Sequence, residues 1–281
     1  MMTRPRSSRI FLAAFAAVLF LTGCGDDDSI WEPRGSSLVT LSFENLQPLG
    51  AGLNYQAWVV ESRPTGYWGS PLGMFNIDET GQLVDPSTGE AISATFEAGL
   101  DAGDVFGVQV SVENSSTPVS QPSATFILGG TVVNGTADLG QVHWLAMNLD
   151  FTEIAGSYFL GTPTDDLNDN ELSGVWFGDN TSGDPVQGLF LPEAPNGWDY
   201  EGWVVIGDDT LSTGKFFNPG IADTTNLYGG ISGEYGFPGQ DFLLNAPEGM
   251  TFPTDLSGAP LFVTLEPWEE SDIEPLSPFR F

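Results

Sequence analysis

Several segments of the chain alternate apolar and polar residues with the period of two that is typical of β-strands. Residues 39–44 read Val-Thr-Leu-Ser-Phe-Glu, residues 108–113 read Val-Gln-Val-Ser-Val-Glu, and residues 261–266 read Leu-Phe-Val-Thr-Leu-Glu. This period predicts antiparallel sheets with one face packed and the other face in water. Residues 55–60, Tyr-Gln-Ala-Trp-Val-Val, lack the alternation and predict a central strand that is covered on both faces.

Turn residues separate these segments. Pro-Thr-Gly at 64–66, Asp-Glu-Thr-Gly at 78–81 and Asp-Pro-Ser-Thr-Gly at 85–89 are typical turn sequences. Beyond the first 23 residues no long apolar stripe has helical spacing. Residues 141–154 come closest to one, and their 148–152 portion is equally compatible with a strand. The pattern therefore predicts an all-β protein.

The chain also repeats itself. The sequence of residues 55–60 recurs in similar form at 200–205, as Tyr-Glu-Gly-Trp-Val-Val. Gly-Met-Phe at 73–75 then matches Gly-Lys-Phe at 214–216. The third match is between the strands at 108–113 and 261–266, and the same spacing carries Phe126 onto Phe279 and Pro122 onto Pro275. The repeat is too long for a solenoid unit and indicates duplication of a whole domain.

These observations predict two tandem, related β-sandwich domains of short strands. The first is expected at residues 38–140 and the second at residues 156–281, with a junction at 141–155. Tyr-Phe-Leu at 158–160 and Val-Trp-Phe at 175–177 are candidate strands that open the second domain.

The amino-terminal segment has a different character. Residues 1–9 carry three arginines and no acid, and residues 10–21 are apolar, a length too short to span a bilayer as a helix. The segment ends in Leu21-Thr22-Gly23-Cys24, which resembles the lipobox of bacterial lipoproteins. The resemblance implies a signal peptide at residues 1–23, cleavage before Cys24, and acyl chains on the sulfur and new amino terminus of Cys24. An ordinary signal peptide with an incidental cysteine is the alternative.

Residues 24–37 would then form an acidic tether that links the lipid to the first domain. Lipoproteins with aspartate directly after the cysteine tend to stay at the inner membrane, whereas this chain has Gly25. By that resemblance the protein is expected in the bacterial cell envelope, lipid-anchored at the outer membrane, on the periplasmic face or at the cell surface.

The strand motifs resemble a known family. Tyr55-x-x-Trp58-Val59-Val60, Gly73-x-Phe75 and the strand at 263–267 are similar to the extracytoplasmic domain of the anti-sigma-K factor family and to envelope lipoproteins related to it. The resemblance covers most of residues 38–281 and implies a fold rather than a chemistry. The chain has neither the cytoplasmic sigma-binding region nor the zinc motif of those factors, so direct binding of a sigma factor is not expected.

The net charge limits the classes of partner that the chain can bind. The chain has 7 basic and 38 acidic residues, a formal net charge of −31. Nucleic acid is excluded as a partner because phosphate binding needs clustered Lys and Arg. The acidity also fits solubility, a saline habitat or weak calcium binding.

With 41% hydrophobic residues, 8 Trp and 20 Phe, the chain can build packed cores despite its charge. Its single cysteine means that no intrachain disulfide supports them.

Catalytic motifs are scarce. His143 is the only histidine, and we interpret it as a strand or interdomain residue rather than a catalytic base. No Gly-x-Ser-x-Gly motif is present, and too few His and Cys exist for a zinc site. Carboxylates are so numerous that a glycosidase pair can be neither identified nor excluded. No enzymatic activity is expected.

Two kinds of binding site are suggested. Trp68, Trp198 and Trp268 stand beside Gly or Pro in apparent loops and are candidates for stacking on sugars, whereas Trp58 and Trp203 occupy strand positions and are predicted core residues.

The second candidate is calcium. Asp166, Asn168 and Asn170 have the one-three-five spacing of an oxygen-ligand loop. Glu171 replaces the turn glycine of an EF-hand and Phe177 replaces its final glutamate, so the loop is not an EF-hand. A solvated acidic loop without metal is the alternative, and no other cofactor is expected.

The leading hypothesis from the sequence is a membrane-anchored, non-catalytic binding or structural module of the envelope, held through lipid on Cys24. An envelope protein or a glycan would be its partner. The alternative is a surface carbohydrate-binding module or glycan-active protein. A third hypothesis is signalling through a partner that carries an anti-sigma domain.

Overall fold

The computed structural model describes residues 37–50, 52–115, 117–230, 235–268, 275 and 279–281. These residues form seventeen β-strands and one turn of 3-10 helix, η1 (Ala102–Asp104), and no α-helix occurs among them. No helix in this part of the chain is long and apolar enough to cross a membrane. The prediction of an all-β fold built from antiparallel sheets is confirmed.

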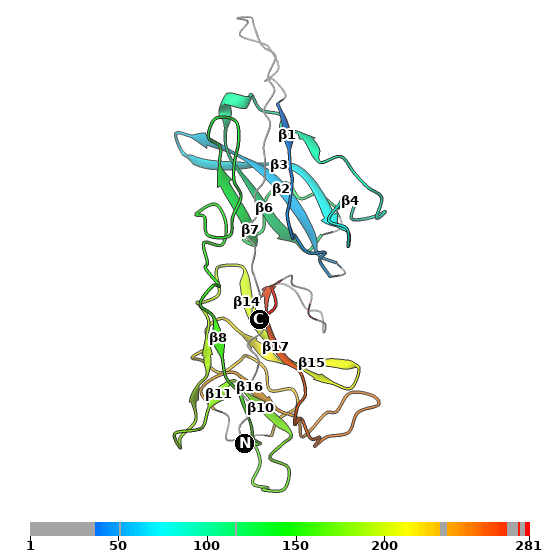
Figure 1. The fold of residues 1–281 in the computed structure, drawn as a ribbon, viewed down its shortest axis with the longest axis vertical. Helices are drawn as coiled ribbons and strands as arrows, with labels where there is room; N and C mark the ends of the chain where they lie inside the picture. Colours follow the sequence, from blue (N-terminus) through cyan, green and yellow to red (C-terminus); the bar gives the residue numbers. More distant parts are fainter. Residues whose placement is uncertain (1–36, 51, 116, 231–234, 269–274, 276–278) are drawn as a thin grey trace, which may run out of the picture.

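The first half of the chain contains a five-stranded antiparallel sheet in the order β4-β3-β2-β6-β7, which is strongly curled (Figure 1). A two-stranded sheet, β1–β5, accompanies it. The strands are β1 (Leu38–Thr40), β2 (Asn54–Arg63), β3 (Gly66–Ile77), β4 (Leu83–Val84), β5 (Thr95–Glu97), β6 (Val105–Glu113) and β7 (Phe126–Thr131).

The second half contains a three-stranded sheet in the order β15-β14-β17 and a second one in the order β16-β10-β9. Two strand pairs, β11–β12 and β13–β8, complete it. The strands are β8 (Ala155–Gly156), β9 (Phe159–Leu160), β10 (Gly174–Trp176), β11 (Gly178–Asp179), β12 (Val186–Gln187), β13 (Leu189–Phe190), β14 (Trp198–Ile206), β15 (Asp209–Phe216), β16 (Gly239–Asp241) and β17 (Leu261–Pro267).

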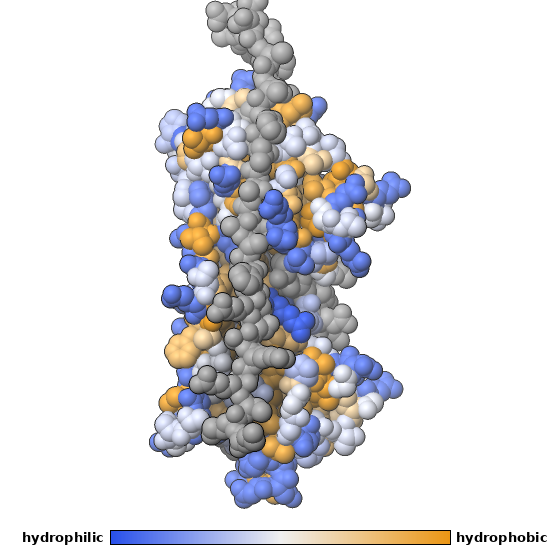
Figure 2. All heavy atoms as spheres, viewed as in Figure 1, coloured by the Kyte–Doolittle hydropathy of each residue, from blue (hydrophilic) through white to orange (hydrophobic). Residues whose placement is uncertain are grey.

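The molecule is elongated, with β1–β7 at one end of its long axis and β8–β17 at the other (Figure 1). Apolar side chains are scattered among hydrophilic ones over the face shown in Figure 2. Long, twisted strands dominate the first half, whereas strands of two or three residues and loops make up much of the second.

The predicted central strand is confirmed. Strand β2 lies between β3 and β6, and residues 54–60 are all buried. In the core, Tyr55 of β2 stacks on Phe75 of β3, with ring centroids 5.6 Å apart and an interplanar angle of 30°. The second half repeats this pair as Tyr200 on Phe216, at 5.6 Å and 28°. In both sheets the tyrosine lies directly opposite the phenylalanine.

A bulge and a buried hydrogen bond also recur. The pairing register shifts immediately before Trp58 in the first sheet and immediately before Trp203 in the second. The Trp58 indole nitrogen donates to Ser111 Oγ at 2.8 Å, and the Trp203 indole nitrogen donates to Thr264 Oγ1 at 2.8 Å. Both rings are fully buried, which confirms that they are core residues. Strands β14, β15 and β17 therefore match β2, β3 and β6 in register as well as in sequence.

The predicted match of Phe126 to Phe279, on the strands beside β6 and β17, is wrong by one residue. Phe126 pairs with Ser111, but the equivalent Thr264 pairs with Arg280 rather than Phe279. The cause is a bulge in the β6–β7 pairing that adds one residue to the first copy.

The sequence also predicted water on one face of the alternating strands, and this is wrong for four polar residues. All four are buried: Ser111, Glu113, Thr264 and Glu266. In the first half the segment that follows β6 folds back over this face. The Gln56 side chain holds it there, since it donates to the Val119 carbonyl at 2.7 Å and accepts from the Val119 backbone amide at 2.9 Å. In the first half a buried polar layer, covered by this segment, therefore replaces the expected solvent-exposed face.

Candidate functional site

The predicted lipid-bearing residue, Cys24, lies outside the described residues, as do the whole signal peptide and most of the tether. The lipobox prediction therefore remains a prediction.

Two of the three candidate tryptophans are exposed. Trp68 was expected in a loop, which is wrong, because it lies on β3 near the β2–β3 turn; it is 51% exposed, with the Arg63 guanidinium 5.3 Å from its ring centroid. Trp268 follows β17 and is 66% exposed, while its backbone amide donates to the Gly197 carbonyl at 2.9 Å. Both rings keep surface that a ligand could contact, although the cation covers part of the Trp68 ring.

The third candidate, Trp198, was predicted to lie in a loop, and this is wrong. It is the first residue of β14 and only 3% exposed, with its ring edge-on to Phe279 at 6.0 Å. Apolar packing at the end of the strand takes the ring into the core, so it offers no face to a sugar.

The candidate calcium loop is held by its own hydrogen bonds. The Asn170 side chain donates to Asp165 at 2.7 Å and accepts from Thr162 Oγ1 at 3.0 Å. Asp166 and Asn168 are exposed. No group of three or more His, Cys, Asp or Glu suited to a metal occurs among the described residues. One of the three proposed ligands is thus already engaged in the loop.

His143 has a defined role in its loop. The Leu145 amide donates to its Nδ1 at 3.1 Å, so the ring proton sits on Nε2, which lies 3.3 Å from Thr131 Oγ1. Burial lowers the pKa of the imidazole, which keeps it neutral at physiological pH. These contacts orient the loop that carries Trp144.

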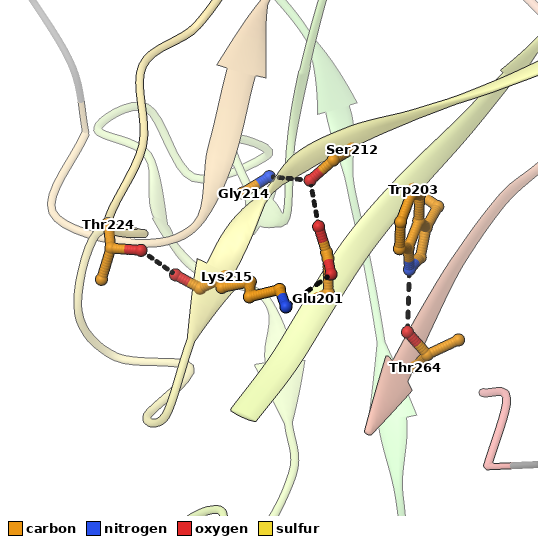
Figure 3. A network of polar contacts seen from close by, with 7 residues as sticks. All are labelled: Glu201, Trp203, Ser212, Gly214, Lys215, Thr224 and Thr264. Carbon is orange, nitrogen blue, oxygen red and sulfur yellow. Dashed lines mark hydrogen bonds and ion pairs between the residues drawn. The ribbon is translucent and has the colours of Figure 1, made fainter. Parts of the chain in front are cut away.

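A charged network crosses the second sheet (Figure 3). Glu201 on β14 is buried and accepts a hydrogen bond from Ser212 Oγ at 2.5 Å, while Lys215 Nζ on β15 lies 3.6 Å from its other oxygen. The Gly214 amide donates to Ser212 Oγ at 3.0 Å. The only lysine of the chain therefore offsets a buried carboxylate, and the serine hydroxyl is held by two partners.

A second buried carboxylate, Asp241 on β16, joins three segments. It accepts hydrogen bonds from the Thr164 amide at 2.8 Å, the Thr164 hydroxyl at 2.5 Å and the Trp176 indole nitrogen at 2.8 Å. Burial raises the pKa of Asp241, and these hydrogen bonds partly oppose the rise. One carboxylate oxygen therefore holds the loop at Thr164 to β16, and the other bonds to Trp176 of β10.

The most notable exposed feature is an aromatic cluster made of Tyr67, Phe106 and Trp144. The Tyr67 ring lies 4.8 Å from both the Phe106 and Trp144 rings, and the latter two lie 5.9 Å apart. Their planes are tilted by 41° to 57°. Tyr67 is 53% exposed and Trp144 is 52% exposed. Phe106 is partly buried beneath these two exposed rings. Three large rings that contact each other thus form a continuous aromatic patch at the surface.

Two strands supply the first two rings. Tyr67 lies on β3 opposite Ser62, where the β2–β3 hairpin extends beyond the core. Phe106 is the extra residue of a bulge in β6, because Val60 pairs with Gly107 and Glu61 pairs with Val105. A bulge of this kind redirects a side chain, and here it lets Phe106 reach Tyr67.

The third ring comes from the segment at 141–147, which lies across β6 and β7. The Gln109 side chain donates to the Leu145 carbonyl at 2.6 Å. A Cβ atom on Gly129 would lie 2.6 Å from the Leu145 carbonyl carbon, and one on Gly107 would lie 2.7 Å from Leu145 Cδ1. Glycine at these positions allows the segment to pack directly on the sheet and to place Trp144 beside Tyr67.

This cluster was not predicted from the sequence, where residues 141–155 are expected to be a junction and the candidate rings are Trp68, Trp198 and Trp268. One signal was present: consecutive strand residues point to opposite faces, so the Tyr67-Trp68 pair must place an aromatic ring on each side of the hairpin. The bulge at Phe106 and the path of residues 141–147 depend on tertiary packing that no local pattern encodes.

Comparison of the chain with protein-family models, with characterised proteins and with solved structures finds no match.

Proposed function

We propose that the protein is a lipid-anchored, non-catalytic binding module of the bacterial cell envelope. Its mature chain would begin at Cys24, and residues 24–37 would tether two related β-sandwich domains at 38–140 and 156–281. The fold would correspond to the extracytoplasmic domain of an anti-sigma-K-like protein without the sigma-binding region.

The proposal of two related domains is supported by the matched registers. The Tyr–Phe stack, the bulge and the Trp–hydroxyl hydrogen bond recur at the positions that the sequence repeat aligns. Unrelated sheets have no reason to share a bulge, a buried donor and its acceptor at matching positions. A duplicated unit accounts for all three.

The observation that carries the binding role is the exposed aromatic cluster of Tyr67, Phe106 and Trp144. By contrast, Glu201 and Asp241 serve the fold through hydrogen bonds to neighbouring strands and loops. A rigid surface of aromatic rings favours binding over chemistry. The exposed Trp68 and Trp268 keep open the narrower alternative of a surface carbohydrate-binding or glycan-active protein.

Anchoring can be tested on the full-length protein in cells. Wild-type protein should incorporate a labelled fatty acid and sediment with membranes, because two or more acyl chains give stable anchoring. Cys24→Ser should lose the label and leave the membrane fraction, and Ser29→Ala serves as the matched control in the tether. A Cys24→Ser protein that stays in the membrane at wild-type levels contradicts the proposal.

A further inference from the structure

We infer that the aromatic cluster binds an uncharged, soluble polysaccharide chain. This inference rests on the proposed binding function and names the ligand class and the site. The site differs from the tryptophans that the sequence suggested, since it is built from Tyr67, Phe106 and Trp144.

The cluster is fixed before any ligand arrives. Tyr67 lies on β3 and Phe106 on β6, the two strands that flank β2, and Trp144 is held by the Leu145 contacts to Gly107, Gly129 and the Gln109 side chain. Rigid aromatic rings lose little conformational entropy on binding. Such prebuilt surfaces typically provide the central contacts of a binding site.

The spacing of the rings selects how a ligand can bind. The centroids lie 4.8 to 5.9 Å apart, so the rings fill the space between them. A quaternary ammonium ion therefore cannot be enclosed by several rings and would contact one solvated face, where the attraction is weak. The ligand must instead lie on the outer surface and cover it with apolar C–H groups.

Polar side chains lie beside the ring-bearing residues, and Asp104 and Ser62 supply oxygen acceptors. Asp104 is exposed two residues before Phe106, and Ser62 is exposed opposite Tyr67. His143 is neutral and its ring lies 5.9 Å from the Trp144 ring. A sugar chain combines apolar C–H faces for the rings with hydroxyl donors for these oxygen atoms. Because the rings are tilted, they suit a soluble chain rather than a flat crystalline surface.

Charge completes the selection. With 38 acidic and 7 basic residues, the protein repels polyanions such as uronic-acid polymers. A neutral polysaccharide is not repelled in this way. The inference therefore predicts a difference between two polymers that share a backbone and differ only in charge.

The test is calorimetric titration of the full-length protein, in a detergent without sugar groups, with hydroxyethyl cellulose, carboxymethyl cellulose, galactomannan and laminarin. We expect saturable binding of at least one neutral polymer and at least about tenfold weaker binding of carboxymethyl cellulose than of hydroxyethyl cellulose at low salt. Trp144→Ala and Tyr67→Ala should each weaken the binding about tenfold or more.

Three variants separate a lost ring from a lost fold. Tyr67→Phe keeps the ring and should keep the binding. Trp68→Ala removes a tryptophan about as exposed as Trp144, and Trp268→Ala removes a more exposed one; both lie outside the cluster and should change affinity less than about twofold. The unfolding temperature of each variant, measured alongside, identifies any that is misfolded, and Trp144→Phe then replaces Trp144→Ala as the weaker-binding variant.

The inference is overturned if no neutral polymer binds, if choline binds in place of the polymers, or if binding depends on Trp68 or Trp268 and survives Trp144→Ala. Release of reducing ends from a bound polymer would contradict the non-catalytic function while leaving the binding site intact. If the wild-type protein took up no labelled fatty acid, that result would contradict the proposed lipid anchor alone. The two proposals can therefore fail separately.

Discussion

Matching residues of the two halves carry different polar groups in the same structural place. Gln56 and Glu201 are both buried on the central strand, where the first is bonded to the loop at Val119 and the second to Ser212 and Lys215. Buried polar groups are costly unless they have partners, and each half provides a partner suited to its own side chain. The repeat thus conserves burial and register while the chemistry of single residues varies.

The tyrosines of the two stacked pairs give the first prediction. Tyr55 Oη donates to the Gln47 carbonyl at 2.8 Å, whereas Tyr200 Oη is buried and meets no hydrogen-bond partner among the described residues. Tyr55→Phe should therefore lower the free energy of unfolding by about 0.5–1.5 kcal/mol, and Tyr200→Phe should be neutral or stabilising. Chemical denaturation of both variants measures the difference. Equal losses at the two sites would show that the hydroxyl environments do not differ in this way.

The charged pair gives the second prediction. Lys215→Met removes the ammonium group that lies 3.6 Å from the buried Glu201 carboxylate and should cost about 1–3 kcal/mol, less than a fully buried pair because the lysine is partly exposed. The double variant Glu201→Gln with Lys215→Met reproduces the Gln56 and Met74 pair of the first half.

This double variant should be more stable than Lys215→Met alone, because no charge is left buried. Denaturation curves of the wild type, both single variants and the double variant complete the cycle. If the two single effects simply add, Glu201 and Lys215 are not energetically coupled, which contradicts this description of the pair.

At the scale of strands and loops, close backbone packing builds the candidate site. The segment at 141–147 lies on β6 and β7 only because Gly107 and Gly129 leave room for Leu145. The same segment carries Trp144 to Tyr67. The position of the surface ring is thus determined by two glycines of the sheet beneath it.

Gly129→Ala should displace this segment. The added Cβ would lie 2.6 Å from a backbone carbon of Leu145, so we expect a loss of about 1–3 kcal/mol and a change in the fluorescence of Trp144. Gly103→Ala, where nothing lies within 4 Å of the added Cβ, should stay within about 0.5 kcal/mol of wild type. Identical stability and spectra for both variants would mean that the segment does not depend on this contact.

The elements that the sequence predicted are those with a local cause. The central strand, the turns at 64–66 and 85–89, and the core tryptophans follow from apolar runs, turn residues and the repeat. The errors have tertiary causes. Ser111 and Glu113 look like solvent-facing strand residues, yet the chain beyond β6 folds over them, and Trp198 looks like a loop residue, yet it packs against Phe279. Of the aromatic cluster, only the presence of rings on both sides of the hairpin could be read from the sequence.

At the scale of the whole molecule, acidity should dominate the response to pH. At neutral pH the many ionised carboxylates repel one another. Burial raises the pKa of Asp241 in the folded protein, so its stabilising effect is complete below the ordinary value of 3.8 and is lost as the pH rises through the raised value. The exposed Asp78 and Asp85 have lowered pKa values owing to hydrogen bonds in their turns, and their contribution is lost only as the pH falls through those values.

Together these groups predict an unfolding temperature that rises as the pH falls through the raised pKa of Asp241 and declines as it falls further, through the lowered pKa values of Asp78 and Asp85. Added salt should raise it at pH 7 by screening the repulsion. Scanning calorimetry across pH and salt checks both trends, and Asp241→Asn should flatten the rise that comes before the decline. A maximum above pH 7, or destabilisation by salt, would contradict this electrostatic description.

An acylated Cys24 at the start of the mature protein would fix where in the cell the aromatic cluster meets its proposed ligand. The intact mass of the protein extracted from membranes measures this directly. We predict a chain without residues 1–23 that carries the added mass of a diacylglycerol and an amide-linked acyl chain on Cys24. A mass equal to the unprocessed chain, or to a processed chain without lipid, would contradict the claim.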